Sequence, residues 1–353
     1  MAWSCGIVGI PNAGKSTLFK ALTALDVTIE SYPFSTIEPN KAVVPIPDRR
    51  LSALAEVSGS EKITPASIEI IDVAGLVEGA SRGEGLGNQF LGHLRNVDLL
   101  IHVVAGFGNS SLSMNDLAAR LEIVHLELAL ADLEVVVRRR QKVEPKLRCG
   151  DKAAQFELNL LDRLEEHLNR GLPLREVNFN PDEKVFLDQL SLLTRKEMVF
   201  VYNLSEDQFQ NPDLSVFPTE SKVVPLCASL EAELADLDQP DRELFLEAYG
   251  LKTSRTVQLL RECYTLLELS TFFTIKGTEA RAWVVPAGIR AVEAAGKVHT
   301  DIESGFINAE VIQWDCLIAE GGLVGAREKG LSSIEGRDYR VQDGDVLYFR
   351  FRS

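Results

Sequence analysis

The sequence has no apolar run of about 18 residues or more, so we expect no membrane-spanning helix. Its five cysteines are scattered without a C-x-x-C pair, which is typical of reduced thiols and argues against a disulfide framework or a zinc site. The first residues lack a basic lead followed by an apolar core, so we expect no secretory signal. These absences together predict a cytoplasmic protein.

Positive charge is also scarce. The 353 residues include 37 lysines and arginines against 52 aspartates and glutamates, which gives a formal net charge of −15. Indiscriminate nucleic-acid binding depends on a cationic surface, so this balance argues against it, and we expect no sequence-specific DNA binding either. The length and an apolar content of 45% indicate a globular protein of two or three domains.

Five short apolar runs, with room for helices between them, predict the core fold. They are residues 4–9, 67–72, 98–105, 197–203 and 222–227. Such runs suit parallel strands that are buried on both faces. Helical character falls in the intervals 16–25, 86–96 and 182–194, the last of which is preceded by a helix-start signal at Asn180, Pro181 and Glu183. This alternation predicts an α/β fold with a doubly wound, mostly parallel sheet.

A different periodicity separates the third and fourth runs. Spacings of four and three residues relate Leu117, Leu121, Val124, Leu128, Ala131 and Val135. This pattern predicts a helical seam of the coiled-coil type. Pro145 and Gly150 then mark a turn, and a second apolar series follows at Phe156, Leu160, Leu164 and Leu168. We therefore expect an antiparallel helical pair over 116–179, inserted into an α/β domain that comprises 1–115 and 180–267.

The turn of this helical pair is basic. Residues 138–152 hold seven lysines or arginines and two acidic residues. A solvated helix face and a docking surface explain such a run equally well.

The character of the chain changes again beyond about residue 268. The segments "STFFTI", "ARAWVV", "AEVIQW" and "DVLYFRF" are typical of strands, and residues 287–296 are typical of a helix. The mixture predicts a small α+β domain over 268–353. Its His299 and Asp301 fit a structural role better than an acid–base pair.

The most specific motif follows the first predicted strand. Residues 9–16, "GIPNAGKS", fit the pattern G-x-x-x-x-G-K-[ST] and stand between a strand and a helix. Glycines let such a loop curl so that successive N–H groups face an anion. The residues assigned to the phosphates are Asn12, Ala13, Gly14, Lys15, Ser16 and Thr17. Lys15 would reach the β- and γ-phosphates and Ser16 would bind Mg²⁺, so we predict a nucleoside triphosphate site.

Two further segments favour a switch-type NTPase over a P-loop kinase. "DVAG" ends the second apolar run, with Asp72 placed to hold the Mg²⁺ shell and the N–H of Gly75 placed to sense the γ-phosphate. In "YPFSTIEPN", Thr36 could close over Mg²⁺ and the γ-phosphate. The predicted Mg²⁺ residues are therefore Ser16, Thr36 and Asp72. The glycine-dense residues 79–89 suit a loop that rearranges with the nucleotide.

The predicted base site departs from the guanine-reading pattern N-K-x-D. The fourth apolar run ends in Asn203, Leu204, Ser205 and Glu206, so leucine replaces the lysine and glutamate replaces the aspartate. Adenine lacks the ring N–H and the 2-amino group that a guanine-reading aspartate accepts, so we favour ATP. Glutamate could still bind guanine, which keeps GTP open. The residues of the next loop, which would flank the base, are Cys227, Ala228 and Ser229.

Together these residues resemble the YchF, or Obg-like ATPase, family within the Obg branch of P-loop GTPase-fold proteins. The resemblance rests on "CGIVGIPNAGKSTLF", "YPFSTIEPN", "DVAGLVEGASRGEGLGNQFL", the N-x-x-E at 203–206, "FFTIKGTEARAW" and "AAGKVHTDIESGF". It implies an NTPase domain, an inserted antiparallel coiled coil and a C-terminal TGS domain of the β-grasp type. It also implies ATP preferred over GTP, association with the ribosome or its large subunit, and regulation of translation or the stress response.

No catalytic base can be assigned from this pattern. Many GTPases place a glutamine after D-x-x-G to orient the attacking water, but Leu76 holds that position here, a replacement that the family shares. Some members carry a histidine in the loop after the third strand, whereas "AGFGNSSLSMNDL" has none. His102 fits a core position and His93 is a weak catalytic candidate, so we expect slow turnover. Asn12 fits a K⁺ ligand and a loop-stabilising residue equally well.

Three functions remain open. In the first, Mg²⁺ and ATP order residues 31–40 and 73–90, and hydrolysis releases them and changes the affinity for a partner. In the second, the protein is a ribosome-binding module that uses nucleotide structurally and contacts the ribosome through the C-terminal domain and Arg138, Arg139, Arg140 and Lys142. The third is a GTP-specific GTPase of the Obg type.

Overall fold

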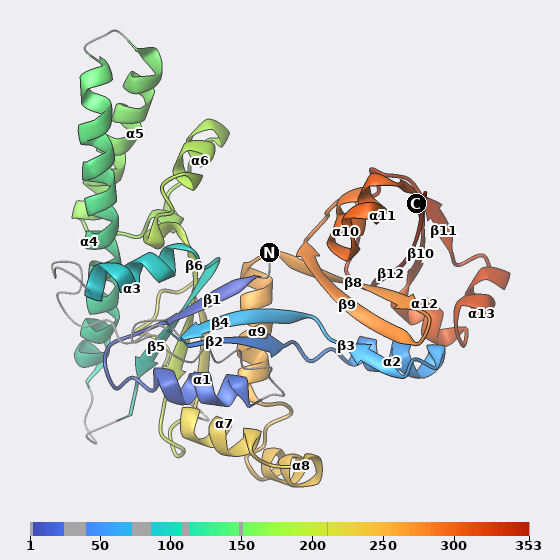
Figure 1. The fold of residues 1–353 in the computed structure, drawn as a ribbon. Helices are drawn as coiled ribbons and strands as arrows, with labels where there is room; N and C mark the ends of the chain where they lie inside the picture. The colour runs from blue at the N-terminus through green and yellow to red at the C-terminus, as the bar shows by residue number, and fades with distance from the viewer. Residues whose placement is uncertain are drawn as a thin grey trace. The chain divides into compact units, whose positions relative to one another are not determined.

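The chain forms two compact units. The computed structural model describes residues 3–24, 40–72, 86–107, 113–147, 151–209 and 211–352, without the side chains of 86–90 and 239. Residues 1–44 and 69–259 form the first unit, and residues 45–68 and 260–353 form the second (Figure 1). This division differs from the predicted boundaries, which assigned residues 45–68 to the NTPase domain.

A six-stranded sheet forms the centre of the first unit. Its order is β2-β4-β1-β5-β6-β7. The strands are β1 (Ser4–Val8), β2 (Asn40–Pro45), β4 (Ser67–Asp72), β5 (Leu99–Ala105), β6 (Glu197–Asn203) and β7 (Lys222–Leu226). β1 pairs in parallel with β4 and with β5, and β5, β6 and β7 continue in parallel. All residues of β1 and β5 are buried, as strands covered on both faces require. The five predicted strands are confirmed, and β2 is an additional one.

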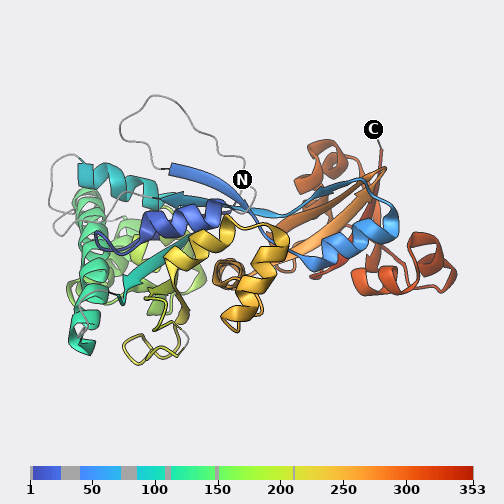
Figure 2. The ribbon, with the colours of Figure 1, turned by 90° about the horizontal axis from the view of Figure 1, so that it is seen from below.

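Helices connect these strands as the alternating pattern predicted. α1 (Lys15–Thr23), α3 (Leu86–Arg95) and α6 (Pro181–Asp188) match the three expected helices, although α6 ends earlier than predicted. Its start is a capping box, because Asn180 Oδ1 accepts from the Glu183 N–H at 2.9 Å and Glu183 accepts from the Asn180 N–H. The described part of the first unit also contains α7 (Ala228–Ala235), which lies beside α1 (Figure 2), and α8 (Gln239–Ala248). α9 (Arg255–Leu266) begins in the first unit and ends in the second.

The predicted helical pair is a hairpin of α4 (Met114–Leu147) and α5 (Lys152–Asn169), which stand side by side in Figure 1. The predicted seam has a different role from the expected one. Its first five residues pack into the core of the sheet, with Val8, Leu100 and Phe200. The contact with α5 uses other α4 residues, Ala129, Val136 and Val143. The 3.6-residue period therefore marked a buried face correctly, but α4 buries two faces against two partners. α4 also continues through Pro145.

The second unit contains a six-stranded sheet of order β11-β10-β12-β8-β9-β3. Its strands are β3 (Lys62–Thr64), β8 (Leu269–Lys276), β9 (Glu279–Pro286), β10 (Phe306–Gln313), β11 (Ser333–Glu335) and β12 (Asp345–Phe351). Neighbouring residues of a strand point to opposite faces. Phe272 packs on one face with α10 (Ala291–Val298) and α11 (Thr300–Ser304). Phe273 packs on the other with α2 (Arg49–Ser58), α12 (Trp314–Ala319) and α13 (Leu323–Glu328).

Residues 45–68 complete this second sheet. α2 contributes Leu51, Leu54 and Ala55 to the core around Phe273. β3 adds an edge strand by pairing in parallel with β9, with Ile63 opposite Ala280. Arg50 links the start of α2 to the segment before β12, because its guanidinium pairs with Asp48, the N-cap of α2, and with Asp343. Within the described ranges, no helix is both long and apolar enough to cross a bilayer.

Candidate nucleotide-binding site

The loop between β1 and α1 needs its glycines for close packing. Gly14 has a φ of 93°, and a Cβ there would lie 2.1 Å from the Nδ2 of Asn203. A Cβ on Gly9 would lie 2.5 Å from the carbonyl oxygen of Val103. Any larger residue would collide at both positions, so the two glycines of the motif are fixed by neighbours that come from β5 and β6.

Asn203 joins the phosphate loop to the loop after β7, which is predicted to flank the base. Its Nδ2 donates to the carbonyl oxygen of Ala13 at 2.9 Å, and its Oδ1 accepts from the N–H of Ala228 at 3.0 Å. The side chain is buried, so both hydrogen bonds replace contacts with water. Residues that lie about 190 positions apart in the chain thus meet at the ends of β1, β6 and β7.

Lys15 and Asp72 are buried together at the end of the loop. The Lys15 Nζ donates to the carbonyl oxygens of Gly9 and Ile10 at 3.0 and 2.8 Å. Burial lowers the pKa of Lys15, and the charge of Asp72 opposes this shift. Burial raises the pKa of Asp72, and the hydroxyl of Ser16 and the charge of Lys15 oppose it. Both shifts disfavour the charged forms, so charged ligand groups would stabilise the ionised site.

The atoms around Asp72 suit a hard divalent cation. The Ser16 hydroxyl donates to Asp72 Oδ2 at 3.2 Å, and Asp72 Oδ1 is buried without a hydrogen-bond partner in the described part of the chain. A hydroxyl, a carboxylate and phosphate oxygens form a donor set typical of Mg²⁺. Among the described residues, no group of three or more histidines, cysteines or acidic residues could hold a metal. Thr36, Gly75 and Leu76 lie outside the described residues.

The predicted base residues line the loops after β6 and β7. Leu204, Cys227 and Ala228 are buried, and the N–H of Leu204 donates to Leu226 at 2.8 Å. Glu206 and Ser229 are exposed, so they can face a ligand.

Two aromatic residues beside this site were not predicted. Phe107 follows β5, and its ring lies 4.0 Å from the position of a Cβ on Gly14. The hydroxyl of Tyr249 donates to Glu206. Phe107 could have been noticed from its place at a strand end, but no local signal links Tyr249 to Glu206.

The remaining predicted residues lie nearby without forming a catalytic group. Asn12 is exposed at a φ of 59°. His93 is half-buried on α3. The core position of His102 is confirmed, since the residue is 1% exposed on β5 and its ring lies 5.7 Å from that of His125 on α4. In the second unit, His299 is structural, because its Nδ1 accepts from the N–H of Asp301 and caps α11.

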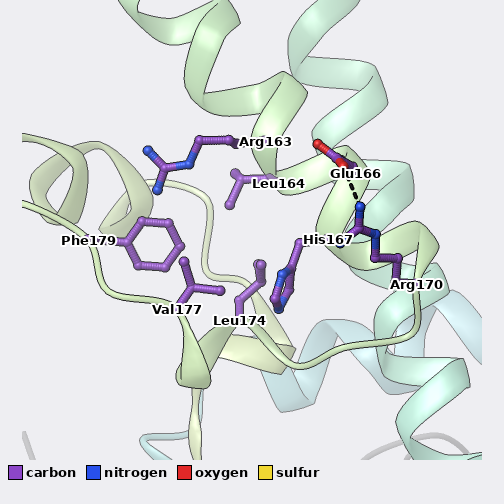
Figure 3. A pocket seen from close by; sticks show the side chains of 8 residues that line it. All are labelled: Arg163, Leu164, Glu166, His167, Arg170, Leu174, Val177 and Phe179. Atoms are coloured by element: carbon purple, nitrogen blue, oxygen red, sulfur yellow. Dashed lines mark hydrogen bonds and ion pairs between the residues drawn. The ribbon is translucent and has the colours of Figure 1, made fainter.

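A separate cavity of about 160 Å³ lies on the helical hairpin (Figure 3). It is lined by α5 and the segment that follows, with Leu164, Leu174 and Phe179 on its apolar side. Its two arginines are already paired, Arg163 with Glu183 at 2.7 Å and Arg170 with Glu166 at 2.6 Å. Both guanidinium groups at the cavity are therefore already neutralised by carboxylates.

The basic end of the hairpin is only partly available for binding. Arg138, Arg139 and Arg140 pair with Glu134, Glu157 and Glu165 of the same hairpin. By contrast, Lys142, Lys146 and Lys152 are exposed, and no described carboxylate forms an ion pair with them. Among the described residues of this surface, these three lysines, here called the hairpin lysines, are the cations without an ion pair.

The fold and the site define a P-loop NTPase of the GTPase fold. The defining features are the parallel α/β sheet, the glycine-rich loop at the end of β1, the lysine in that loop and the carboxylate on the adjacent strand β4. A family model described as a 50S ribosome-binding GTPase matches residues 4–138, and a model of the C-terminal region of YchF GTPases, described as a protein of unknown function, matches residues 269–352. The chain belongs to the YchF family.

The assignment to the YchF family is supported by relatives that match over nearly the whole chain. The ribosome-binding ATPase YchF of Bacillus subtilis (strain 168) is 41% identical over 364 residues, which cover 99% of this chain and 100% of that protein. The ribosome-binding ATPase YchF of Escherichia coli O157:H7 is 43% identical, with 99% of each chain covered. The structure of the Schizosaccharomyces pombe YchF GTPase superposes with a TM-score of 0.86 at 28% identity, covering 99% of this chain and 97% of that one.

Proposed function

We propose that this protein is an ATP-binding, slowly ATP-hydrolysing switch of the cytoplasm that associates with the ribosome and regulates translation or the stress response. The observation that carries the proposal is the group at the phosphate loop in which Lys15 and Asp72 are buried and the exposed Ser16 donates its hydroxyl to Asp72. The names of the relatives, ribosome-binding ATPases, support the same function.

The phosphate loop would bind the triphosphate through its amides, from Asn12 to Thr17, and through Lys15. The Lys15 ammonium would exchange the carbonyl oxygens of Gly9 and Ile10 for phosphate oxygens. Ser16 and Asp72, with Thr36, would hold Mg²⁺, which neutralises charge on the phosphates when bound. Asn12, in the same loop, would serve as a K⁺ ligand or as a loop-stabilising residue.

Slow turnover follows from the residue type that the motif predicts beside the γ-phosphate. Leu76 cannot orient a water molecule by hydrogen bonding. His93 is the weak catalytic candidate on α3, and His102 is excluded from that role because it is buried in the core. Without a base that orients the attacking water, the rate acceleration would come from positioning of the triphosphate and from electrostatic stabilisation of the transition state.

Lys15→Ala tests the enzymatic proposal. Purified protein with ATP, Mg²⁺ and K⁺ is expected to release phosphate slowly, and Lys15→Ala is expected to lower the rate about a hundredfold, because the lysine charge at the phosphates is lost. Lys20→Ala is the matched control, since Lys20 lies on the same helix and its side chain is 64% exposed. The proposal fails if Lys15→Ala and wild type release phosphate equally, with and without ribosomes.

A second candidate function is a ribosome-binding module with structural nucleotide, and the hairpin lysines favour it. Exposed, unpaired cations suit the phosphates of ribosomal RNA. Lys142→Glu with Lys146→Glu is expected to reduce cosedimentation with ribosomes roughly tenfold at low salt, and less at high salt.

The charge-matched control for this pair is Lys184→Glu with Lys252→Glu, two lysines exposed elsewhere on the first unit. Equal loss in both pairs would exclude a specific hairpin contact. Equal cosedimentation of the ATP and ADP forms would favour the module over the switch, and no cosedimentation in any state would contradict ribosome association.

A further inference from the structure

The side chain of Glu206 is held by a residue outside the nucleotide-binding motifs. Glu206 lies three positions after Asn203, where a base-reading carboxylate is expected. Tyr249 directly follows α8, and its hydroxyl donates a hydrogen bond to Glu206 Oε1. Both residues belong to the first unit, although they are separated by 43 positions in the chain.

The ring of Tyr249 is fixed by aromatic packing. Its centroid lies 4.8 Å from that of Phe245 on α8 and 6.3 Å from that of Phe209, which is buried in the loop after β6. The N–H of Tyr249 also donates to the carbonyl oxygen of Phe245 at 3.2 Å. The hydroxyl is therefore presented to Glu206 by a ring with little freedom to move.

The hydroxyl remains a donor at physiological pH. The hydrogen bond to Glu206 raises the pKa of Tyr249 above its ordinary value, because loss of the phenolic proton would place two negative groups in contact. Glu206 is thus paired with a permanent neutral donor.

This pairing changes what the carboxylate can read. Guanine presents two donors side by side, its ring N–H and its 2-amino group, and a carboxylate binds them with both oxygens. Adenine presents one exocyclic amine beside a ring nitrogen that accepts hydrogen bonds and is repelled by a second carboxylate oxygen. A glutamate whose Oε1 already accepts from Tyr249 has one lone pair of that oxygen occupied and is a weaker acceptor for a second donor, so it suits the single donor of adenine better than the two of guanine.

We propose that Tyr249 is a specificity-determining residue that engages one oxygen of Glu206 and so disfavours guanine relative to adenine. The inference rests on the proposed nucleotide site and adds a positioning residue to it. Tyr249 acts through Glu206 and need not touch the nucleotide.

Tyr249→Phe is the test, because it removes the hydroxyl and keeps the ring. Equilibrium titrations with ATP, GTP and ITP are expected to show an ATP-to-GTP affinity ratio that falls roughly three- to tenfold, mainly through tighter GTP binding. ITP keeps the ring N–H of guanine but lacks its 2-amino group, so its gain is expected to be smaller. Tyr264→Phe, which removes a hydroxyl that contacts Thr271 in the second unit, is expected to leave the ratio unchanged.

Glu206→Gln tests whether Tyr249 acts through Glu206. If Tyr249 acts through Glu206, Tyr249→Phe has no further effect on the ratio in the Glu206→Gln background. An unchanged ratio in Tyr249→Phe, or an equal change for ATP, GTP and ITP, overturns the inference and leaves the nucleotide site intact. Failure of the wild type to bind any of the three nucleotides overturns the proposed function itself, and this inference with it.

Discussion

Replacing Asp132 with alanine is expected to lower the free energy of unfolding of the first unit by about 3–5 kcal/mol. Asp132 lies on α4, is 0% exposed, and receives hydrogen bonds from α3 and from the short 3-10 helix Leu193–Arg195. Its oxygens accept from the N–H of Leu193 at 2.9 Å, the N–H of Thr194 at 2.7 Å and the Thr194 hydroxyl at 2.8 Å. Arg95 at the end of α3 completes the group at 3.1 Å.

The size of this effect follows from what remains after truncation. Burial raises the pKa of Asp132, and the N–H groups of Thr194 and Leu193 and the charge of Arg95 oppose that shift. Alanine would leave two buried N–H groups without an acceptor and the partly buried guanidinium of Arg95 with carbonyl partners but no carboxylate, and unsatisfied buried groups are costly. Asp132→Asn retains one acceptor oxygen and is expected to lose about half as much.

Urea unfolding followed by circular dichroism measures the loss, and hydrogen exchange at the amides of Leu193 and Thr194 locates it. Asp162→Ala on α5 is the control, because Asp162 is 55% exposed and its removal is expected to have little effect. If Asp132→Ala unfolds at the same urea concentration as wild type, the carboxylate does not fasten the hairpin to the sheet.

Stability is expected to fall by about 3 kcal/mol between pH 6.5 and pH 4 because of His125 alone. Burial, with the nearby charge of Arg175, lowers the pKa of His125 from 6.5 to about 4, and one pKa unit corresponds to about 1.36 kcal/mol. In that interval His125 is protonated in the unfolded chain but stays largely neutral in the folded chain, so acidification favours unfolding. Stability from this source is complete above pH 6.5 and is lost as the pH falls to the folded pKa.

His102 acts in the same direction. Its pKa is lowered well below the ordinary value by complete burial, and the neighbouring charges of His125, Arg175 and Lys15 add to the shift. His102 Nδ1 and His125 Nε2 are buried without hydrogen-bond partners among the residues that the structure describes, so a proton on either atom would lack an acceptor there.

Thermal or urea unfolding at pH 7, 5.5 and 4.5 measures this effect. His125→Phe keeps an aromatic ring against Phe200 and is expected to remove most of the pH dependence attributed to His125. His299→Asn, at a histidine whose side chain is 61% exposed, should retain the wild-type dependence. A His125→Phe variant with the full wild-type slope would show that other groups bind the protons.

The sequence predicted the features that depend on neighbouring residues. Each buried parallel strand is one short apolar run, and the phosphate loop is one motif in which Gly14 and Lys15 are adjacent. The capping box of α6 needs only Asn180 and Glu183, three positions apart. Such features are local, and local patterns are sufficient to identify them.

The features that the sequence could not predict depend on distant partners. α2 carries caps that a sequence could reveal, Asp48 at its start and Gly59 at a φ of 65° after its end. Nothing in it, however, indicates that Leu54 packs with Phe273. In the same way, the spacing in α4 predicted a buried face, but it did not indicate that the sheet would cover this face. The contact of Tyr249 with Glu206 joins two segments that have no common motif.

The place of residues 45–68 governs how the protein can be divided. The chain passes between the two units at three points, after Val44, before Glu69 and after Leu259. A gene fragment that begins at residue 260 would encode a sheet without its β3 border and without Leu51, Leu54 and Ala55 in its interior. The second unit therefore cannot be transplanted as a C-terminal cassette, and no single proteolytic cut releases it with all of its residues.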